Sequence, residues 1–362
     1  MKILIHGINY SPELVGAGKY TGELGAWLAA KGHEVRAVVA PPYYPEWRIA
    51  EGYFGCRYLR EQILGVKVWR CPVWIPRKQN GIRRAFHLLS FAFGSLPVML
   101  LQICWRPHLI LVIEPTFAVV PQALLVARVT RAKAWLHVQD FEIEAAFTLG
   151  VVKGGLLKKI LGVIESWFMR RFDWVTTISK SMLRGLAQKG ISPEKSFLIP
   201  NWVDTDFIRP SEGTSSFRDL HGLSQDQKIV LYAGNLGEKQ GLENLVEVAR
   251  RLQNCKDLIL RNPEGQVVEG GSLLFIICGA GTARTRLITL ADRYGLSNLR
   301  FLPLQAAREF PGMLAAADIH LVLQRKGAAD LVMPSKLSGI MAAGGTTIVT
   351  AEPGTELAQL VS

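Results

Sequence analysis

Three glycine-rich turns each come after a short apolar run, and they occupy residues 16–18, 234–241 and 279–281. An apolar run that ends in glycine is typical of a buried strand followed by a helix. Glycine lets the backbone approach a ligand closely, and the free N–H groups at a helix start attract an anion such as a phosphate. A tight turn without a ligand explains these glycines equally well, so phosphate binding stays one of two interpretations.

Ionisable side chains stand within one of these turns and at a further strand end. Lys239 lies in the second turn, where its ammonium could reach a phosphate. His137 and Asp140 come at the end of an apolar run, and parallel sheets bind ligands at the carboxyl ends of their strands. His137 and Asp140 are therefore candidates for acid–base chemistry or hydrogen bonding, with a purely structural histidine as the open alternative.

Apolar runs alternate with segments of helical spacing in both halves of the chain. This alternation predicts Rossmann-like α/β domains, in which helices connect parallel strands. A chain of 362 residues is too long for one typical core, so we expect two domains, at 1–208 and 209–362. The predicted strands are 2–8, 35–40, 109–114, 134–137, 174–178, 228–233, 273–278, 299–302, 318–323 and 347–350, and predicted helices include 20–30, 242–252 and 334–343.

The chain is strongly basic, with a formal charge of +12 from 42 basic and 30 acidic residues. Such a charge predicts a polyanionic partner: a nucleic acid, an anionic membrane surface or a phosphorylated substrate. No nucleic-acid-binding motif occurs, so we expect no nucleic-acid partner. The five cysteines lie too far apart for a metal site, and the first residues have none of the features of a cleavable signal peptide.

Residues 85–105 contain no acidic or basic side chain and approach the length of a bilayer span. A glycine and a proline interrupt this run, and arginines flank it on both sides. Three interpretations stay open: an interfacial helix on an anionic membrane, an ordinary buried helix, and a true span. Residues 156–171 add an apolar stripe bordered by lysines and arginines, which suits a membrane-facing helix or a core helix with a solvated face.

Four motifs resemble those of the retaining nucleotide-sugar glycosyltransferases of family four, which have the GT-B fold. The motif at 199–207, between the two halves, is the most specific. The four motifs are residues 28–35 (LAAKGHEV), 199–207 (IPNWVDTDF), 232–241 (YAGNLGEKQG) and 334–344 (PSKLSGIMAAG). Within the family, residues 5–20 and 41–48 are most similar to enzymes of colanic acid biosynthesis.

The resemblance implies an α/β protein whose two Rossmann-like domains face each other across a cleft. Residues 1–208 would form the acceptor-side domain with membrane-facing helices, and residues 209–362 the nucleotide-sugar-binding domain, apparently without the family's last helices. The catalytic candidates stay His137 and Asp140. Asp204 and Asp206 have the Asp-x-Asp spacing that binds a metal in another glycosyltransferase fold. Here they lie inside the interdomain motif, so we interpret them as structural and expect no metal. The donor-binding residues that the resemblance implies, or that we nominate beside them, are Gly16, Gly18, Asn201, Gly234, Asn235, Lys239, Gln240, Gly279, Gly281 and Lys336.

The sequence departs from the family pattern at two positions that usually carry positive charge. Asn235 stands where the family has an arginine, and Gln240 stands where it has a lysine. A donor diphosphate still needs cations, so we expect Lys239 and Lys336 to supply the missing charge.

Further departures concern the family's acidic pair, its histidine and its C-terminus. The usual two glutamates fall at Leu331 and Gly339, and the usual catalytic-region histidine falls at Gln139. The chain also stops at Ser362, before helices that the family normally has, which suggests a truncated form. These departures favour an alternative in which the protein is catalytically inactive.

The activity that the resemblance implies is a metal-independent transfer of a sugar that keeps its anomeric configuration. The donor would be a nucleoside diphosphate sugar, for which GDP-fucose is the suggestion, and no other cofactor is expected. The acceptor would be a polyprenyl-diphosphate-linked glycan at the anionic cytoplasmic face of a bacterial inner membrane, where the protein would be peripheral. Two alternatives stay open: a nucleotide-sugar 2-epimerase, and a catalytically inactive or truncated membrane-bound assembly partner.

Overall fold

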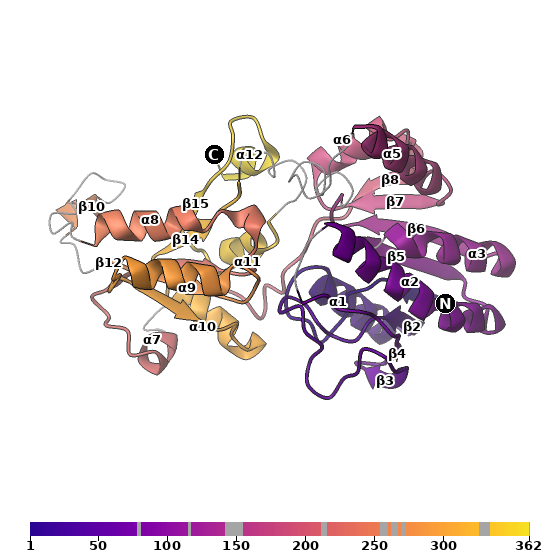
Figure 1. The fold of residues 1–362 in the computed structure, drawn as a ribbon, viewed down its shortest axis with the longest axis horizontal. Coiled ribbons are helices and arrows are strands. Elements are labelled where there is room, and N and C mark those ends of the chain that lie inside the picture. Colours follow the sequence, from indigo (N-terminus) through magenta and orange to yellow (C-terminus); the bar gives the residue numbers. More distant parts are fainter. Residues whose placement is uncertain are drawn as a thin grey trace. The chain divides into compact units, whose positions relative to one another are not determined.

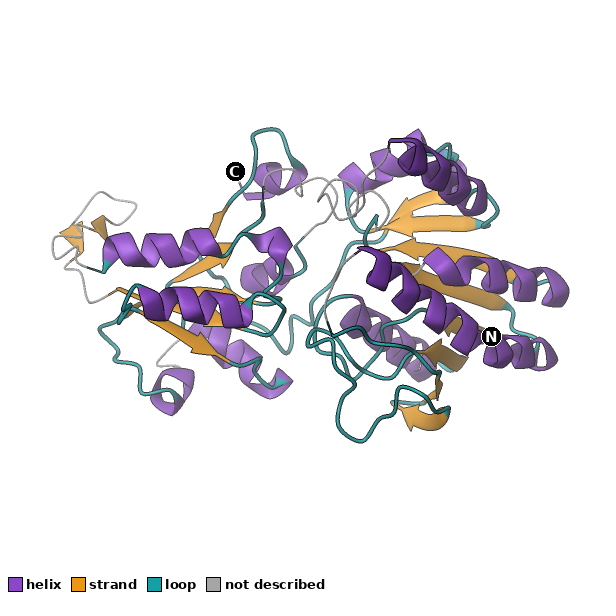
Figure 2. Cartoon of the chain, viewed as in Figure 1, coloured by secondary structure: helices purple, strands orange, loops and turns teal. Residues whose placement is uncertain are grey.

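The computed structural model describes residues 1–77, 81–114, 117–141, 155–210, 216–253, 260–261, 267–268, 273–325 and 334–361. The chain forms two compact units that divide between Asn201 and Trp202, and we call them the N-terminal and the C-terminal unit. This division lies inside the motif at 199–207, close to the expected boundary after residue 208. Each unit has its own sheet with helices packed against it, as Figures 1 and 2 show.

The N-terminal unit contains an eight-stranded sheet in the order β3-β4-β2-β1-β5-β6-β7-β8. Its strands are parallel except for the antiparallel hairpin of β3 and β4 at one edge. The strands are β1 (Lys2–His6), β2 (Glu34–Val39), β3 (Leu59–Ile63), β4 (Val66–Arg70), β5 (Leu109–Glu114), β6 (Lys133–Val138), β7 (Trp174–Thr177) and β8 (Ser196–Leu198). The helices are α1 (Ala17–Ala30), α2 (Gly81–Trp105), α3 (Val120–Thr130), α5 (Gly155–Met169) and α6 (Lys180–Gln188), with 3₁₀ turns η1 (Phe117–Val119) and η2 (Pro193–Lys195).

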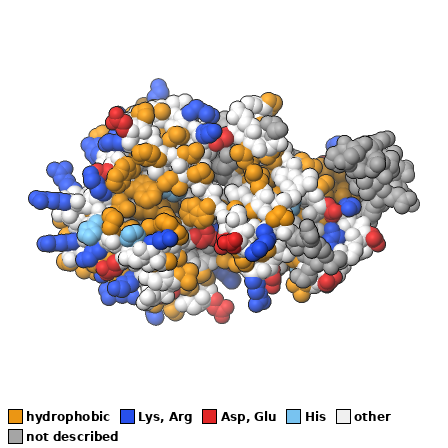
Figure 3. Space-filling view, turned by 180° about the vertical axis from the view of Figure 1, so that it is seen from behind, with side chains coloured by type: hydrophobic (Ala, Val, Ile, Leu, Met, Phe, Trp, Pro, Cys, Tyr) orange, Lys and Arg blue, Asp and Glu red, His pale blue; other side chains and the backbone are white. Residues whose placement is uncertain are grey.

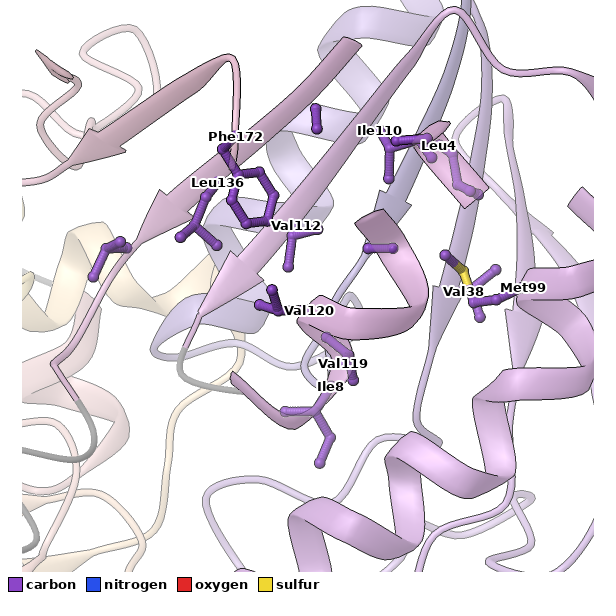
Figure 4. Packing of buried hydrophobic residues seen from close by; sticks show 14 of the residues in the cluster. Leu4, Ile8, Val38, Met99, Ile110, Val112, Val119, Val120, Leu136 and Phe172 are labelled. Atoms are coloured by element: carbon purple, nitrogen blue, oxygen red, sulfur yellow. The ribbon is translucent and has the colours of Figure 1, made fainter. Parts of the chain in front are cut away.

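Successive strand residues of this sheet point to opposite faces, and each face has its own apolar core. Leu4 and Val112 pack with Met99 of α2 and Val120 of α3 in one core, part of which Figure 4 shows. Their neighbour Ile5 belongs to the other core, which α1 covers. Because helices cover both faces, the strands are apolar at nearly every position, and this explains the continuous runs in the sequence.

Helix α2 packs one face into the N-terminal unit and leaves another face exposed. Its buried residues recur at helical spacing, and they include His87, Phe91, Ser95, Val98 and Gln102. By length and composition the helix could cross a membrane, but 33% of its most apolar 18-residue window is buried inside the protein. If α2 crossed a membrane, its buried face would have to leave the core of the N-terminal unit. The structure therefore favours the buried and interfacial interpretations.

The C-terminal unit contains a five-stranded parallel sheet in the order β13-β12-β9-β14-β15. Its strands are β9 (Lys228–Ala233), β12 (Leu273–Cys278), β13 (Leu299–Leu302), β14 (Ile319–Val322) and β15 (Thr347–Val349), and a small separate pair is β10 (Leu260–Arg261) and β11 (Val267–Val268). The helices are α7 (Ser216–Leu220), α8 (Glu243–Leu252), α9 (Arg284–Arg293), α10 (Phe310–Ala315), α11 (Lys336–Ala342) and α12 (Glu356–Val361), with 3₁₀ turns η3 (Glu238–Gln240) and η4 (Ala307–Glu309).

The predicted strands are all present, and those at 109–114, 228–233, 273–278 and 299–302 match residue for residue. The helix predicted at 20–30 begins earlier, at Ala17, so the first glycine turn lies directly at a helix start. The hairpin of β3 and β4 was not predicted, because these strands at a partly solvated sheet edge are short and rich in polar residues, with three in a row in β3.

Candidate functional site

The second and third glycine turns lie against each other at the carboxyl ends of β9 and β12. The N–H of Gly234 donates to the carbonyl of Cys278 over 2.9 Å. A methyl group added at Gly279 would lie 1.9 Å from the carbonyl oxygen of Gly234, and one added at Gly281 would lie 2.6 Å from that of Leu236. Close packing between the two turns therefore requires both glycines, independently of any ligand.

Lys336 begins α11 and places its ammonium against the first of these two turns. Its Nζ lies 3.5 Å from the centroid of the Tyr232 ring, and a methyl group added at Gly234 would lie 3.3 Å from this Nζ. The residue as a whole is half-buried, but the Nζ atom is enclosed and has no hydrogen-bond partner among the described residues. Burial lowers the pKa of Lys336 to about 7. An enclosed amine of this kind favours the approach of an anion.

The two residues that depart from the family pattern take part in the hydrogen bonds of the turn at 234–241, Gln240 through its side chain and Asn235 through its backbone carbonyl. The side-chain oxygen of Gln240 accepts a hydrogen bond from the N–H of Gly237 over 3.1 Å. The hydroxyl of Tyr232 donates to the carbonyl of Asn235 over 2.8 Å. The side chain of Lys239, the other cation expected here, lies outside the described part of the structure.

Two arginines that the sequence analysis did not select also hold this turn. Arg325 follows β14, and its Nη2 lies 3.3 Å from a carboxylate oxygen of Glu243. Arg286 of α9 reaches Glu238 of the turn over 2.9 Å. These pairs are exposed, so each contributes little to stability, but together they connect η3 and the start of α8 to neighbouring elements.

The positions of the family's two glutamates do not provide a carboxylate here. Leu331 lies outside the described residues. Gly339 lies in α11, and a methyl group added there would lie 3.5 Å from the Phe310 ring and 3.7 Å from Leu314 of α10. A side chain at 339 would therefore face α10 inside the unit, and this position does not offer a carboxylate to a ribose.

The first glycine turn packs against a buried carboxylate that the sequence analysis did not select. One oxygen of Glu13 accepts hydrogen bonds from the N–H groups of Tyr43 and Tyr44 over 3.1 and 3.0 Å, and the other accepts one from the Asn9 amide over 2.9 Å. A methyl group added at Gly18 would lie 2.3 Å from the Glu13 carboxylate. Gly18 thus makes room for Glu13, and Glu13 ties the turn to the loop at 41–47.

Gly16 and a buried arginine complete this arrangement. Gly16 has a φ of 66°, which favours glycine, and a methyl group there would lie 3.3 Å from the Tyr44 ring. Arg70 of β4 is buried, and it donates to the carbonyls of Ser11 over 2.5 Å and Ala40 over 3.0 Å. Sequence alone offers no signal for these contacts, because each joins residues that are distant along the chain.

Glu13 titrates at an unusual pH, which makes its role testable. Burial raises the pKa of its carboxyl to about 7, although its hydrogen bonds and the charge of Arg70 oppose this shift. The unfolded chain therefore binds fewer protons than the folded chain between the ordinary pKa of 4.5 and about 7. Through this group, the free energy of unfolding should fall as the pH rises across that interval.

Glu13→Ala should lower the free energy of unfolding by about 2–4 kcal/mol, because two backbone N–H groups lose their acceptor. Glu13→Gln should cost less than about 1 kcal/mol, since an amide oxygen can still accept a hydrogen bond, and it should flatten the pH dependence described above. Chemical denaturation between about pH 5 and pH 8 measures both effects. Equal stability of the two variants would contradict the role given to the carboxylate.

The structure fixes His137 in a network of hydrogen bonds. The Gln139 amide lies 2.9 Å from Nε2 and donates to it, so the proton is on Nδ1, which donates to the Thr176 hydroxyl over 2.8 Å. Trp135 donates to the same hydroxyl over 2.7 Å. Burial lowers the pKa of His137 to about 4, so the ring is neutral near pH 7. A neutral ring whose two nitrogens are both engaged suits orientation better than proton transfer.

Asp140 lies closer to the first glycine turn. It is half-buried after β6, and its charge contributes, with that of Glu13, to raising the pKa of Tyr44 to about 12, although burial is the main cause. The structure thus brings Asp140, Tyr44 and Gly16 to the same end of the N-terminal sheet.

Asn201, the remaining donor-binding candidate, directly precedes the division between the two units. Its side-chain oxygen is buried and has no hydrogen-bond partner within the described part of the chain. The structure therefore leaves this oxygen able to accept a hydrogen bond.

Two family models match the chain, one on each side of the division. A glycosyl transferase 4-like domain matches residues 15–202, and the model of glycosyl transferases group 1 matches residues 214–357. A relative in Escherichia coli (strain K12), named as a colanic acid biosynthesis glycosyl transferase, WcaI, is 42% identical over 99% of this chain and 86% of its own length. A relative in Pseudomonas aeruginosa, named as a glycosyltransferase, WbjE, is 25% identical over 60% of this chain and 52% of its own.

Solved structures share the fold at lower identity. A sucrose-phosphate synthase from Thermosynechococcus elongatus has a TM-score of 0.70 at 17% identity, over 98% of this chain and 82% of its own. HepE from Anabaena, in complex with UDP and glucose, has a TM-score of 0.63 at 16% identity, over 100% and 83%. WaaG, a glycosyltransferase involved in lipopolysaccharide biosynthesis, has a TM-score of 0.65 at 15% identity, over 99% and 83%.

Proposed function

The chain belongs to the glycosyltransferase family that these two domain models describe, and from that premise we propose that it transfers the sugar of a nucleoside diphosphate sugar to a lipid-linked glycan. Its fold is the GT-B fold, with a Rossmann-like unit on each side of the division. The acceptor is a glycan on polyprenyl diphosphate, built up into a colanic-acid-like exopolysaccharide. This part of the proposal rests on the name of the Escherichia coli relative and on the motifs at 5–20 and 41–48.

The observation that carries the proposal is the enclosed amine of Lys336 beside the turn at 234–241, which has no hydrogen-bond partner among the described residues. Ligands of such folds bind at the carboxyl ends of parallel strands, and the turn follows β9. A donor diphosphate there would raise the pKa of Lys336 from about 7, so the amine would become a cation paired with phosphate oxygens.

In the proposed reaction, the positive charge of Lys336 lies where negative charge develops on the leaving group. As the bond between sugar and diphosphate breaks, the departing diphosphate gains negative charge, which Lys336 and backbone N–H groups of the turn can stabilise. The acceptor hydroxyl attacks the same face of the sugar, and its proton passes to the diphosphate oxygen that leaves, so the anomeric configuration is kept. In this proposal a lysine, not a metal, supplies the positive charge.

His137 and Asp140 remain the proposed catalytic residues on the acceptor side. The neutral, fixed ring of His137 would orient a hydroxyl, whereas the carboxylate of Asp140 could accept a hydrogen bond from one. Asp140→Asn and His137→Gln test this assignment. Both should lower the transfer rate by at least about tenfold while leaving nucleotide binding intact. Unchanged transfer in either variant would remove that residue from the proposal.

The donor is proposed to be GDP-fucose, which the resemblance suggests, whereas HepE of similar fold is known with UDP. Calorimetric titration of the full chain in detergent with GDP, UDP and ADP tests the choice. GDP should bind, and the other two should bind at least about tenfold more weakly. Selective binding of UDP or ADP would replace the proposed donor.

The same titration, together with analysis of the products formed from the nucleotide sugar with and without an acceptor, separates the alternative functions. Binding followed by sugar transfer with retained configuration supports the transferase. Conversion of the nucleotide sugar without an acceptor would instead indicate the 2-epimerase. Failure to bind any of the three nucleotides would favour the inactive assembly partner and would contradict the role of Lys336.

We also propose that the layer of α2, α3 and α5 rests on the anionic cytoplasmic face of the inner membrane, so that the protein is peripheral. Large apolar side chains are exposed along α2 and α5, and they include Ile82, Phe86, Phe93, Leu156, Ile160, Val163 and Trp167. Exposed apolar helix faces of this kind are typical of interfacial binding. In Figure 3, Lys and Arg side chains also project from the edge of the N-terminal unit, at the left, and positive charge attracts anionic lipids.

Phe86→Ser/Phe93→Ser should weaken binding to phosphatidylglycerol-containing vesicles by at least about tenfold, because these side chains are 61% and 73% exposed and would lose contact with the lipid. Trp27→Ser/Phe54→Ser is the matched control, with side chains 58% and 55% exposed elsewhere in the N-terminal unit. Vesicle co-sedimentation measures both. Equal losses in the two double variants would contradict the assignment of the membrane face.

A further inference from the structure

A cavity of about 520 Å³ lies at the N-terminal end of α2, apart from the glycine turns and the His137 network. Its lining combines the apolar residues Trp74, Ile75 and Pro76 with the cationic residues Arg77 and Arg83. This volume lies within the range of small-molecule sites, roughly 300–1,000 Å³. The mixed lining suits a ligand with an apolar part and an anionic part.

The apolar wall is held in place by backbone contacts to α2. The N–H of Trp74 donates to the hydroxyl of Ser90 over 2.9 Å, and the carbonyl of Trp74 accepts from Nδ1 of His87 over 2.7 Å. His87 in turn lies 3.1 Å from the Tyr43 hydroxyl. The Trp74 side chain, in contrast, is 47% exposed. The fold therefore fixes this segment through its backbone and leaves the indole available to a ligand.

The charge of the cavity is positive, since the described residues that line it supply two guanidinium groups and no carboxylate. Guanidinium groups bind phosphate oxygens through paired hydrogen bonds. The exposed apolar face of α2 begins next to the cavity, at Ile82 and Phe86. A hydrocarbon chain that leaves the cavity would therefore continue over an apolar surface.

We propose that this cavity binds the prenyl diphosphate end of the lipid-linked acceptor, with the phosphates at Arg77 and Arg83 and the first isoprene units against Trp74 and Pro76. This rests on the proposed function for the existence of such an acceptor, but the site itself is assigned from the lining of the cavity. A linked pair of phosphates uses both arginines, and the flat indole suits an unsaturated chain better than solvent.

Farnesyl diphosphate is a soluble probe of this site. It should bind the full chain in the presence of a saturating donor nucleotide, which prevents its diphosphate from occupying the turn at 234–241. Inorganic diphosphate and farnesol should each bind at least about tenfold more weakly, because each lacks one half of the contacts. Calorimetric titration measures all three.

The variant Arg77→Ala/Arg83→Ala should bind farnesyl diphosphate at least about tenfold more weakly, and Trp74→Ala should also weaken binding. Arg128→Ala/Arg184→Ala removes the same charge from exposed positions of α3 and α6 and should bind as the wild type does. Equal binding by the two double variants would overturn the proposal. Inorganic diphosphate binding as tightly as farnesyl diphosphate would also overturn it, because the apolar wall would then contribute nothing.

Two further results distinguish a prenyl diphosphate site from a bulk-lipid site and from the donor site. If Arg77→Ala/Arg83→Ala lost vesicle binding but kept farnesyl diphosphate binding, the cavity would bind bulk phospholipid and the proposal would fail. GDP, UDP and ADP titrated into the same variants report on the proposed function independently. Arginine-dependent binding of farnesyl diphosphate without any nucleotide binding would support the cavity and refute the donor site.

Discussion

Lys336→Met should weaken donor-nucleotide binding by about a hundredfold and leave the free energy of unfolding unchanged or higher. Methionine keeps most of the apolar stem but removes the amine, which would lose charge-assisted hydrogen bonds worth about 1.5–3 kcal/mol each to the diphosphate. The free protein loses nothing comparable, because this amine is enclosed without a hydrogen-bond partner among the described residues. Calorimetric titration and chemical denaturation measure the two quantities.

Arg293→Met is the matched control for this experiment. Arg293 is an exposed cation in the last turn of α9 in the same unit, so its replacement removes the same charge away from the turn. It should leave nucleotide affinity within about twofold of the wild type. If Lys336→Met kept full donor affinity, Lys336 would not be part of the donor site. If both variants lost the same affinity, the loss would come from the net charge of the protein and not from a contact of Lys336.

The titration of Lys336 adds a second readout to the same prediction. Its pKa is lowered from 10.5 to about 7 by burial, so the unfolded chain binds more protons between these values and stability should rise with pH through that interval. A bound diphosphate should raise the pKa again, so binding near about pH 8 should take up protons. Titrations in two buffers with different ionisation enthalpies measure this uptake, which Lys336→Met should lack.

Gly279→Ala should abolish nucleotide binding and lower the free energy of unfolding by more than about 3 kcal/mol. The added methyl group would lie 1.9 Å from the carbonyl oxygen of Gly234, so one of the two turns has to move. Its φ of 150° is also a conformation that side-chain-bearing residues rarely adopt. The N–H groups of Gly234 and Leu236 donate to the carbonyls of Cys278 and Ala280, so movement of either turn disturbs the turn at 234–241, against which Lys336 packs. Chemical denaturation and nucleotide titration test this result.

Gly295→Ala is the control that distinguishes the steric clash expected in Gly279→Ala from the cost of a positive φ alone. Gly295 also has a positive φ, of 61°, but nothing lies within 4 Å of an added methyl group. Its replacement should therefore cost only about 1 kcal/mol and leave nucleotide binding intact. If Gly279→Ala were as mild as Gly295→Ala, the close packing of the two turns would not be needed for the site.

The strands and the turns that follow them were predictable, because their signals are local. A strand covered on both faces must be apolar at nearly every position, and the runs at 109–114, 228–233 and 273–278 show this directly. Glycines after such runs predicted where helices start. The edge strand β3 is different, since it is largely exposed and its run of three polar residues conceals the pattern.

The motif resemblance also predicted the family, but it did not show what each candidate residue contacts. Gly279 and Gly281 were expected to bind the donor, and the structure shows in addition that they make room for the neighbouring turn. His137 was a candidate for acid–base chemistry, and the structure shows that burial keeps its ring neutral while Thr176 and Gln139 fix its orientation. Such roles depend on neighbours that the sequence order does not bring together.

The charge state of the site was decided by folding, through burial and long-range contacts. In the sequence Lys336 is one of 42 basic residues, and Glu13 is one of 30 acidic ones. Enclosure beside Tyr232 and Gly234 lowers the pKa of the lysine, and burial beside Gly18 raises that of the glutamate. The amino-acid order determines which groups can ionise, but the surrounding atoms, which come from distant elements, set the cost of the charge.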